Sequence, residues 1–233
     1  MWAKLCTVVP KETKVPDTLV FLWLCDYQGA LTVGYHRLCS FGRRRLFAAY
    51  IGGIKKVRYI QMINKYHFDT WHLSPYEWKE YAQACVKYLN THNCKTVVDI
   101  GCGLGEILQH IKADKKIGLD LQEEVIMAAQ ELNGGKIDFV VGSFGELIEN
   151  PIDYLITLNF MHGGTEDEWV ETYHTAAERN DVRHFIVDTV PEKAFSPTTH
   201  SLDWSKILPD NYKRIERLGP FLSGRYVEVW ERQ

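Results

Sequence analysis

From residue 96 to residue 190, short apolar runs alternate with segments of helical periodicity. The apolar runs predict buried strands, because a strand covered on both faces shows no polar alternation. These runs are residues 96–101, 116–121, 136–142, 151–160 and 183–190. Helices are predicted at residues 105–112, 122–133, 144–149 and 166–179, and residues 212–232 read as two alternating strands joined by a Gly/Pro loop. This order predicts a Rossmann-like, doubly wound α/β fold, whose mostly parallel sheet is closed by a C-terminal antiparallel hairpin.

The chain before residue 96 is predicted to be helical and irregular. A helix at residues 76–90 gathers one apolar face from Trp78, Ala82, Val86 and Leu89. Residues 46–66 have mixed helical spacing, interrupted by Gly52 and Gly53. Residues 1–35 allow a hairpin, an irregular arm or an interfacial segment. We therefore divide the chain into an N-terminal basic extension and lid, residues 1–75, and a main domain, residues 76–233.

Charge is unevenly distributed between these two parts. Residues 1–75 hold eleven Lys and Arg against four Asp and Glu, whereas residues 76–233 hold sixteen against twenty-six. A basic arm is suited to meet phosphate, nucleic acid or a membrane surface, although it is equally well explained as a solvated face. The six cysteines form no CxxC pair, and the N-terminus has no long apolar core like that of a secretory signal. These features predict free thiols and a cytoplasmic protein, with peripheral membrane contact left open.

Candidate chemistry begins where the first predicted strand ends, in the stretch VVDIGCGLGEIL. Three alternate glycines, Gly101, Gly103 and Gly105, open this turn. In such sheets the first strand–helix turn is the usual ligand site, and a helix N-terminus there would offer free amide N–H groups. Asp120 closes the second predicted strand, twenty-one residues after Asp99, which is the position for binding two ribose hydroxyls.

Two cofactor classes use this arrangement, and the local sequence separates them. Dinucleotide binders require G-x-G-x-x-G or -A, whereas the spacing here is G-x-G-x-G followed by Glu106. An acid in the first helical turn would repel a pyrophosphate. Asp99 lies where it could attract an ammonium group, which a dinucleotide lacks. Both features favour an adenosyl amino acid over NAD.

The stretch VVDIGCGLGEIL resembles motif I of the class I S-adenosylmethionine-dependent methyltransferases, and the resemblance runs from about residue 76 to the C-terminus. It implies S-adenosyl-L-methionine as cofactor and S-adenosyl-L-homocysteine as product. It also implies that the cofactor is lined by residues from four strand ends. By this resemblance Asp99, Gly101 and Gly103 line the methionine part of the cofactor, and Asp120 binds the ribose hydroxyls. Leu121 packs on the adenine, and Ser143 and Phe144 contact the adenine amine and ring edge. Asn159 faces the amino group or the acceptor. The implied set is Asp99, Gly101, Cys102, Gly103, Gly105, Asp120, Leu121, Ser143, Phe144 and Asn159.

The methyl acceptor is expected beyond the fourth predicted strand, in TLNFMHGG. This stretch lacks the Asn/Asp-Pro-Pro-aromatic signature of exocyclic-amine methylases, and it lacks the cysteine needed for the covalent route to pyrimidine carbon 5. His162 is the predicted base for an oxygen acceptor, since a neutral imidazole accepts a proton near pH 7; the alternative is a polar loop histidine bonded to backbone. His72 is the second candidate. No metal is predicted, because Asp188 would be the only carboxylate beside Asn159 and His162.

The segment KYHFDTWHLSPYEW, residues 65–78, mixes aromatic rings with hydrogen-bonding groups, as a sugar-binding lid does. The sequence therefore predicts O-methylation of a small or carbohydrate-containing acceptor, with phosphate- or lipid-linked acceptors included. Two alternatives stay open: an RNA or protein methyltransferase that grips its substrate through GRRR and KKVR, or a noncatalytic binding module. Nucleic acid is the disfavoured partner, and the oligomeric state is not predicted.

Overall fold

The computed structural model describes residues 23–25, 31–33, 40–159, 161–194 and 196–233. Contacts divide the chain into two units, Met1–Phe47 and Ala48–Gln233. In the first unit, β1 (Trp23–Cys25) pairs antiparallel with β2 (Leu31–Val33), so the hairpin among the alternatives for the N-terminal segment is present. Residues 48–75 belong to the second unit. The domain boundary expected at residue 75 stays a prediction, because the division by contacts does not show which segment folds independently.

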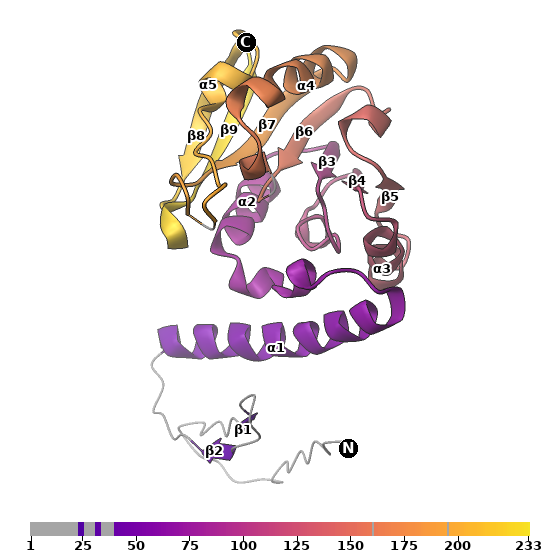
Figure 1. Cartoon of the computed structure of the whole chain (residues 1–233), viewed down its shortest axis with the longest axis vertical. Coiled ribbons are helices and arrows are strands. Elements are labelled where there is room, and N and C mark those ends of the chain that lie inside the picture. The colour runs from indigo at the N-terminus through magenta and orange to yellow at the C-terminus, as the bar shows by residue number, and fades with distance from the viewer. Residues whose placement is uncertain (1–22, 26–30, 34–39, 160, 195) are drawn as a thin grey trace. The chain divides into compact units, whose positions relative to one another are not determined.

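The second unit is built on a seven-stranded sheet in the order β5-β4-β3-β6-β7-β9-β8 (Figure 1). Five strands run parallel: β3 (Thr96–Ile100), β4 (Lys115–Asp120), β5 (Asp138–Val141), β6 (Ile152–Thr157) and β7 (Val182–Thr189). The closing hairpin is β8 (Tyr212–Leu218) and β9 (Tyr226–Arg232), and β9 inserts antiparallel between β7 and β8. The predicted doubly wound fold with a C-terminal antiparallel hairpin is thereby confirmed.

Helices cover both faces of this sheet. Neighbouring positions of β3 face opposite ways: Val97 packs in the cluster that contains α2 (Glu80–Thr91) and Ile126 of α3 (Glu123–Asn133). Val98 packs in the cluster that contains α4 (Glu166–Arg179) and α5 (Trp204–Ile207). This explains why β3, β4, β6 and β7 read as apolar runs, since both of their faces are largely buried, whereas the edge strand β5 is mostly exposed.

A third cluster attaches the segment before α2 to the sheet domain. Helix α1 (Ser40–Tyr66) continues through Gly52 and Gly53, which the sequence pattern marked as an interruption. Its Tyr59 and Met62 are buried against Leu104 and against Val125 of α3. No helix in the described part of the chain is long and apolar enough to span a bilayer.

The helix predicted at residues 105–112 is wrong. The chain there forms turns followed by one 3₁₀ helix, η3 (Leu108–His110). Tertiary partners take the backbone groups that a helix would use: the side chain of Asn90 in α2 donates to the carbonyl of His110 at 2.9 Å and accepts from the amide of Lys112 at 2.7 Å. Gln109 still donates to the carbonyl of Gly105 in the helical pattern, but the bonds to Asn90 use the backbone groups that a helix would need beyond this point.

The helix predicted at residues 76–90 is also shorter than expected. It begins as a 3₁₀ turn, η2 (Tyr76–Trp78), and α2 follows only from Glu80. Ala82, Val86 and Leu89 are buried as predicted, whereas Trp78 is 43% exposed because it precedes the α-helix. The helix predicted at residues 144–149 is likewise a single 3₁₀ turn, η4 (Phe144–Glu146).

Candidate active site

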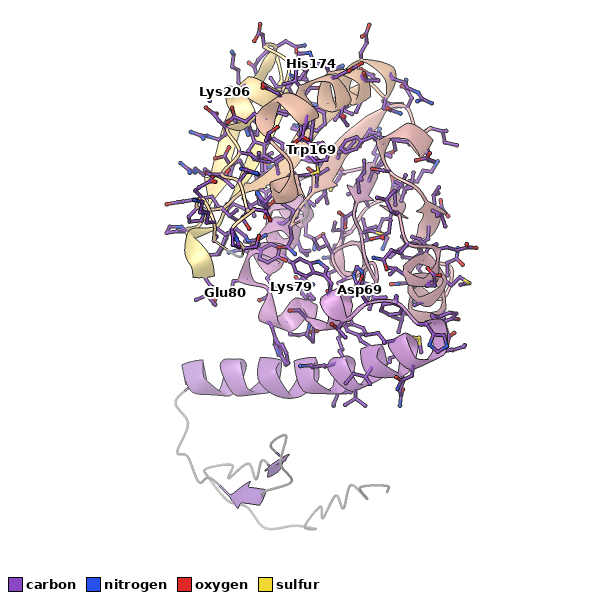
Figure 2. All side chains as sticks on the ribbon, in the orientation of Figure 1. Asp69, Lys79, Glu80, Trp169, His174 and Lys206 are labelled. Atoms are coloured by element: carbon purple, nitrogen blue, oxygen red, sulfur yellow. The ribbon has the colours of Figure 1, made fainter. Side chains whose placement is uncertain are left out.

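A cavity of about 530 Å³ lies where the strand order reverses, at the carboxyl ends of β3, β4 and β6. Its walls come from the glycine turn after β3, the loop after β4, Ser143, Leu158 and Asn159, the segment from Trp71 to Tyr81, and the β8–β9 loop. Strand-order reversal opens a crevice because the connections that follow β3 and β6 pass over opposite faces of the sheet. Figure 2 shows Asp69, Lys79 and Glu80 together on one side of the molecule, away from Trp169, His174 and Lys206 around α4 and α5.

The glycine turn explains the alternate glycines in the sequence. Gly101, Gly103 and Gly105 have φ values of +73°, +53° and +73°, in the left-handed region that side chains disfavour. At Gly103 space is limiting as well, because a Cβ there would lie 2.9 Å from Nδ1 of His72. Gly103 therefore lets the turn fold back and lets the lid approach it.

Four amides of this turn, those of Gly101, Cys102, Gly103 and Gly105, are bonded within the protein and are not the free N–H donors expected there. Gly101 and Cys102 both donate to the carbonyl of Leu119, at 2.8 and 2.9 Å. Gly103 donates to Oδ2 of Asp120 at 3.0 Å, and Gly105 donates to the carbonyl of Cys102 at 3.0 Å. These four amides are therefore not available to an anion, and with no α-helix directly after the turn the site is poorly suited to a pyrophosphate.

Carboxylates dominate the wall beside this turn. Asp99, Glu106 and Asp120 are 3%, 7% and 8% exposed, and all three line the cavity. Burial raises the pKa of Asp99 to about 8, and the nearby charge of Asp120 acts in the same direction. Glu106 is paired with Lys79 at 2.5 Å and accepts from the amide of Tyr76 at 3.0 Å. No ion pair within the described residues neutralises Asp99, so this wall is suited to a cationic ligand.

Asp120 is held in a fixed orientation with acceptor capacity to spare. Its Oδ2 accepts from the amide of Gly103, and its Oδ1 accepts from the amide of Gln122 at 3.1 Å. An ionised carboxylate has about four acceptor positions. Two remain at the cavity wall, which matches the two hydroxyls of a ribose.

His72 lies on the lid side of the cavity. It belongs to η1 (Thr70–Leu73), which Asp69 caps by accepting from the amide of Trp71 at 2.7 Å. Gln122 donates to the other oxygen of Asp69 at 2.8 Å and so joins the lid to the loop after β4. Burial lowers the pKa of His72, although Asp120 and Asp69 oppose this, so the imidazole is neutral near pH 7 and can accept a proton.

The opposite wall is a bonded cluster at the ends of β6 and β7. Arg225 is buried and donates to both Asp188 and Oδ1 of Asn159, the latter at 2.5 Å. Its guanidinium also lies over the ring of Tyr81, 4.2 Å from the centroid. Burial alone would raise the pKa of Asp188, but the hydrogen bond and charge of His162 and the charge of Arg225 outweigh it and hold the pKa below its usual value.

His162 is not among the residues that line the cavity. It is buried in η5 (Met161–Gly163), and its Nε2 lies 3.1 Å from Oδ1 of Asp188. Facing an ionised carboxylate, Nε2 carries the hydrogen, and Nδ1 is left buried with no hydrogen-bond partner in the described part of the chain. The base role predicted for His162 stays a prediction that this placement does not favour.

The oxygens considered for a metal are already engaged. Oδ1 of Asp188 accepts from the amide of Asn159 at 3.1 Å and meets His162, and Oδ2 accepts from Arg225. Among the described residues, no group of three or more His, Cys, Asp or Glu side chains is arranged to hold a metal ion.

Most of the other predicted residues reach the cavity. Those that line it are Asp99, Gly101, Cys102, Gly103, Asp120, Leu121, Ser143 and Asn159. Gly105 and Phe144 do not: Gly105 faces the ring of Phe139, where a Cβ would lie 2.6 Å away, and Phe144 packs edge-on to Tyr173 in the core. Ser143 caps η4 together with Glu146.

Sequence reasoning missed Arg225, Tyr81 and the pairing of Glu106 with Lys79. Arg225 reaches Asn159 across 66 residues, and nothing local to the β8–β9 loop indicates a partner. A weak signal was present in SGRYVEVW, where a lone arginine precedes an otherwise apolar strand next to a glycine.

Comparisons with known proteins agree with this geometry. A family model described as a methyltransferase domain matches residues 97–179, which run from β3 to the end of α4. No curated protein matches the chain at a significant level.

Several solved structures share the fold. Magnesium protoporphyrin IX methyltransferase from Synechocystis PCC 6803, with bound S-adenosylmethionine, superposes with a TM-score of 0.56 at 14% identity, over 80% of this chain and 97% of that one. The N-methyltransferase NodS from Bradyrhizobium japonicum, in complex with S-adenosylhomocysteine, gives 0.56 at 13% identity, over 75% and 97%. A TehB-like enzyme from Corynebacterium glutamicum gives 0.50 at 18% identity, over 66% and 89%. At such identities the likeness shows the fold.

Proposed function

We propose that the chain is a class I S-adenosylmethionine-dependent methyltransferase, which binds S-adenosylmethionine and transfers the methyl group to an oxygen of a small or carbohydrate-containing acceptor. When bound, the cofactor supplies an electrophilic methyl carbon on a sulfonium. Two of the solved structures with this fold hold S-adenosylmethionine or S-adenosylhomocysteine, which supports the same cofactor here.

The residues of the first wall fit such a ligand part by part. Asp120 keeps two acceptor positions for the ribose hydroxyls after bonding Gly103 and Gln122. Asp99 offers a buried carboxyl, lacking a counter-ion in the described structure, to an ammonium group. Leu121 and Ser143 line the part of the cavity where the adenine would lie.

The single observation that carries the proposal is the set of three buried carboxylates around a turn in which the amides of Gly101, Cys102, Gly103 and Gly105 are bonded within the protein. A pyrophosphate would meet three acidic side chains, and four amides of the turn are already bonded, so a dinucleotide fits poorly. A ligand with a sulfonium and an ammonium group gains favourable interactions at the same place.

Isothermal titration calorimetry with S-adenosylmethionine and S-adenosylhomocysteine tests this assignment. The wild-type chain is expected to bind both, and Asp120→Ala is expected to weaken both by about 10–100-fold, because hydrogen bonds to a charged group are lost. Asp138→Ala is the matched control, since Asp138 is exposed at the start of the neighbouring strand. Equal binding by Asp120→Ala and wild type contradicts the ribose assignment. A wild-type chain that binds neither ligand is the noncatalytic module.

The acceptor side of the cavity carries aromatic rings with polar neighbours. Trp71, Trp78, Tyr81 and Phe221 line it, and the first two are exposed at its mouth. Aromatic faces stack on the C–H faces of sugars or on other rings, which supports a carbohydrate or small aromatic acceptor. The alternative of an RNA or protein acceptor stays a prediction. Two lysines of the KKVR stretch that would grip such a substrate have partners within the protein: Lys55 pairs with Glu77 at 2.7 Å, and Lys56 lies over the Trp78 ring at 5.5 Å.

For a hydroxyl acceptor, we assign proton removal to His72 rather than His162, because His72 lines the cavity and is held neutral. Transfer from labelled S-adenosylmethionine to a panel of sugars and phenols measures this role. His72→Ala is expected to lower turnover by about 10²–10⁴-fold. His162→Ala, checked for its fold by thermal unfolding, is expected to lower it far less. The opposite ranking contradicts the assignment.

A further inference from the structure

The orientation of the Asn159 side chain is set by a neighbour that can only donate hydrogen bonds. Arginine has five N–H donors and no acceptor, so the Asn159 atom 2.5 Å from the Arg225 guanidinium must be the carbonyl Oδ1. The amide NH₂ group therefore points away from Arg225. No hydrogen bond within the described residues uses that NH₂ group.

The main chain of Asn159 is held in place as well, so a backbone movement does not reverse the orientation of its side-chain amide. Its main-chain amide donates to Oδ1 of Asp188 at 3.1 Å, and its φ of +70° places it in the left-handed region. Asp188 in turn accepts from Arg225, so one arginine holds both the carboxylate beneath Asn159 and its side-chain carbonyl. The ring of Tyr81 lies against the same guanidinium and keeps it in place.

We propose that Arg225 is a specificity-determining positioning residue, which turns the N–H donors of Asn159 into the cavity and so selects an acceptor atom that accepts hydrogen bonds. This rests on the proposed function, and it gives a structural reason for an oxygen acceptor, either a carboxylate, a phenolate or a hydroxyl. An amine acceptor would present N–H donors to N–H donors. The reversed amide would offer a carbonyl to an amine, and Arg225 prevents that orientation.

The chemistry balances without another reactant. A lone pair of the acceptor oxygen forms the new C–O bond while the C–S bond breaks, and the electron pair of that bond stays on sulfur as a neutral thioether. An ionised oxygen releases no proton. A hydroxyl transfers its proton to His72. The Asn159 N–H donors stabilise negative charge on the oxygen before the transfer and hold its lone pair in line.

A pair of cofactor analogues tests this orientation without knowledge of the acceptor. Sinefungin is an adenosyl amino acid that carries a protonated amine where the transferred methyl group would be, whereas S-adenosylhomocysteine carries nothing there. The measured quantity is the ratio of their dissociation constants by calorimetry. Because both ligands share every other contact, a general loss of fold or cavity shape changes both affinities and cancels in the ratio.

Two variants are expected to move the ratio toward sinefungin. Asn159→Asp keeps an oxygen for Arg225 and turns a second carboxylate oxygen toward the amine, so sinefungin should gain about tenfold relative to S-adenosylhomocysteine. Arg225→Leu releases the amide to rotate, and a gain of about threefold is expected. Arg214→Leu, an exposed arginine of β8 outside the cavity, should leave the ratio unchanged.

Ratios that stay within twofold of wild type in Asn159→Asp overturn the proposal. If Arg225→Leu does not fold, because Asp188 is left without its cation, Asn159→Asp decides alone. The two hypotheses fail differently: a wild-type chain that binds neither analogue overturns the proposed function, and this inference with it. Binding of both with no response to the variants overturns only the role of Arg225.

Discussion

Two aspartates close neighbouring parts of the same sheet and behave in opposite ways. Asp99 lies at the end of β3 and Asp188 near the end of β7, and they are 3% and 0% exposed. Burial raises the pKa of Asp99 to about 8, whereas His162 and Arg225 hold the pKa of Asp188 below its usual value in spite of burial. Because both residues are aspartates and both are buried, the opposite shifts of their pKa values come from their different partners.

Asp99 therefore belongs to a site whose charge is balanced only when a cationic ligand binds, whereas the charge of Asp188 is already balanced within the protein. Asp99 faces Asp120 and has no ion-pair partner in the described structure, so its ionised form is unfavourable until a cation arrives. Asp188 has hydrogen bonds from Arg225, His162 and the amide of Asn159. Under the proposed function, the wall of Asp99, Glu106 and Asp120 would hold the cationic cofactor, and the cluster of Asp188, Asn159 and Arg225 would orient the acceptor.

Removing the Asp188 carboxylate should have the largest effect on the free energy of unfolding. Asp188→Ala leaves the buried Arg225 without its carboxylate and is expected to lower the free energy of unfolding by about 3–5 kcal/mol. Asp99→Ala removes a carboxyl that has no counter-ion, so a much smaller loss is expected at pH 7. Urea denaturation of both variants checks the contrast. Equal losses would mean that Asp99 and Asp188 play the same structural role.

The pH dependence of stability sharpens the contrast with an effect that is smaller for each pH unit. The pKa of Asp99 is about 8 in the folded chain and near its ordinary 3.8 when unfolded, so between these values the folded state holds a proton that the unfolded state has lost. Stability from this group is therefore full below about pH 4 and falls as pH rises toward 8, by at most about 1.4 kcal/mol per pH unit. Subtracting the Asp99→Asn curve from the wild-type curve between pH 5 and 9 isolates this slope. A flat difference contradicts the raised pKa.

The smallest signal is the proton released when the cofactor binds. At pH 6 Asp99 is protonated and the ammonium group of S-adenosylhomocysteine is charged, so binding should release up to about one proton as the pKa of Asp99 falls. Calorimetry in buffers with different ionisation enthalpies counts that proton. Asp99→Asn is the control and should release none from this position. Proton uptake by wild type would place the ammonium group elsewhere.

How far the sequence predicted these features depends on how local their causes are. The strand alternation, the glycine turn and the acid at the end of β4 were all predicted, because each depends on residues within a few positions. The helix after the glycine turn was wrong because the side chain of Asn90 supplied competing hydrogen bonds. Arg225 was missed because its partners lie 37 and 66 residues away.

The sequence by itself determined the order of the strands along the chain, the backbone freedom of the turn at Gly101, Gly103 and Gly105, and the acidic character of the cofactor wall. Backbone conformation and hydrophobic periodicity act over short distances, so they are written into neighbouring residues. Only the tertiary structure decided which aspartate is charged, which histidine reaches the cavity, and which way the Asn159 amide points. Burial and donor–acceptor pairing depend on groups that folding brings together from distant parts of the chain.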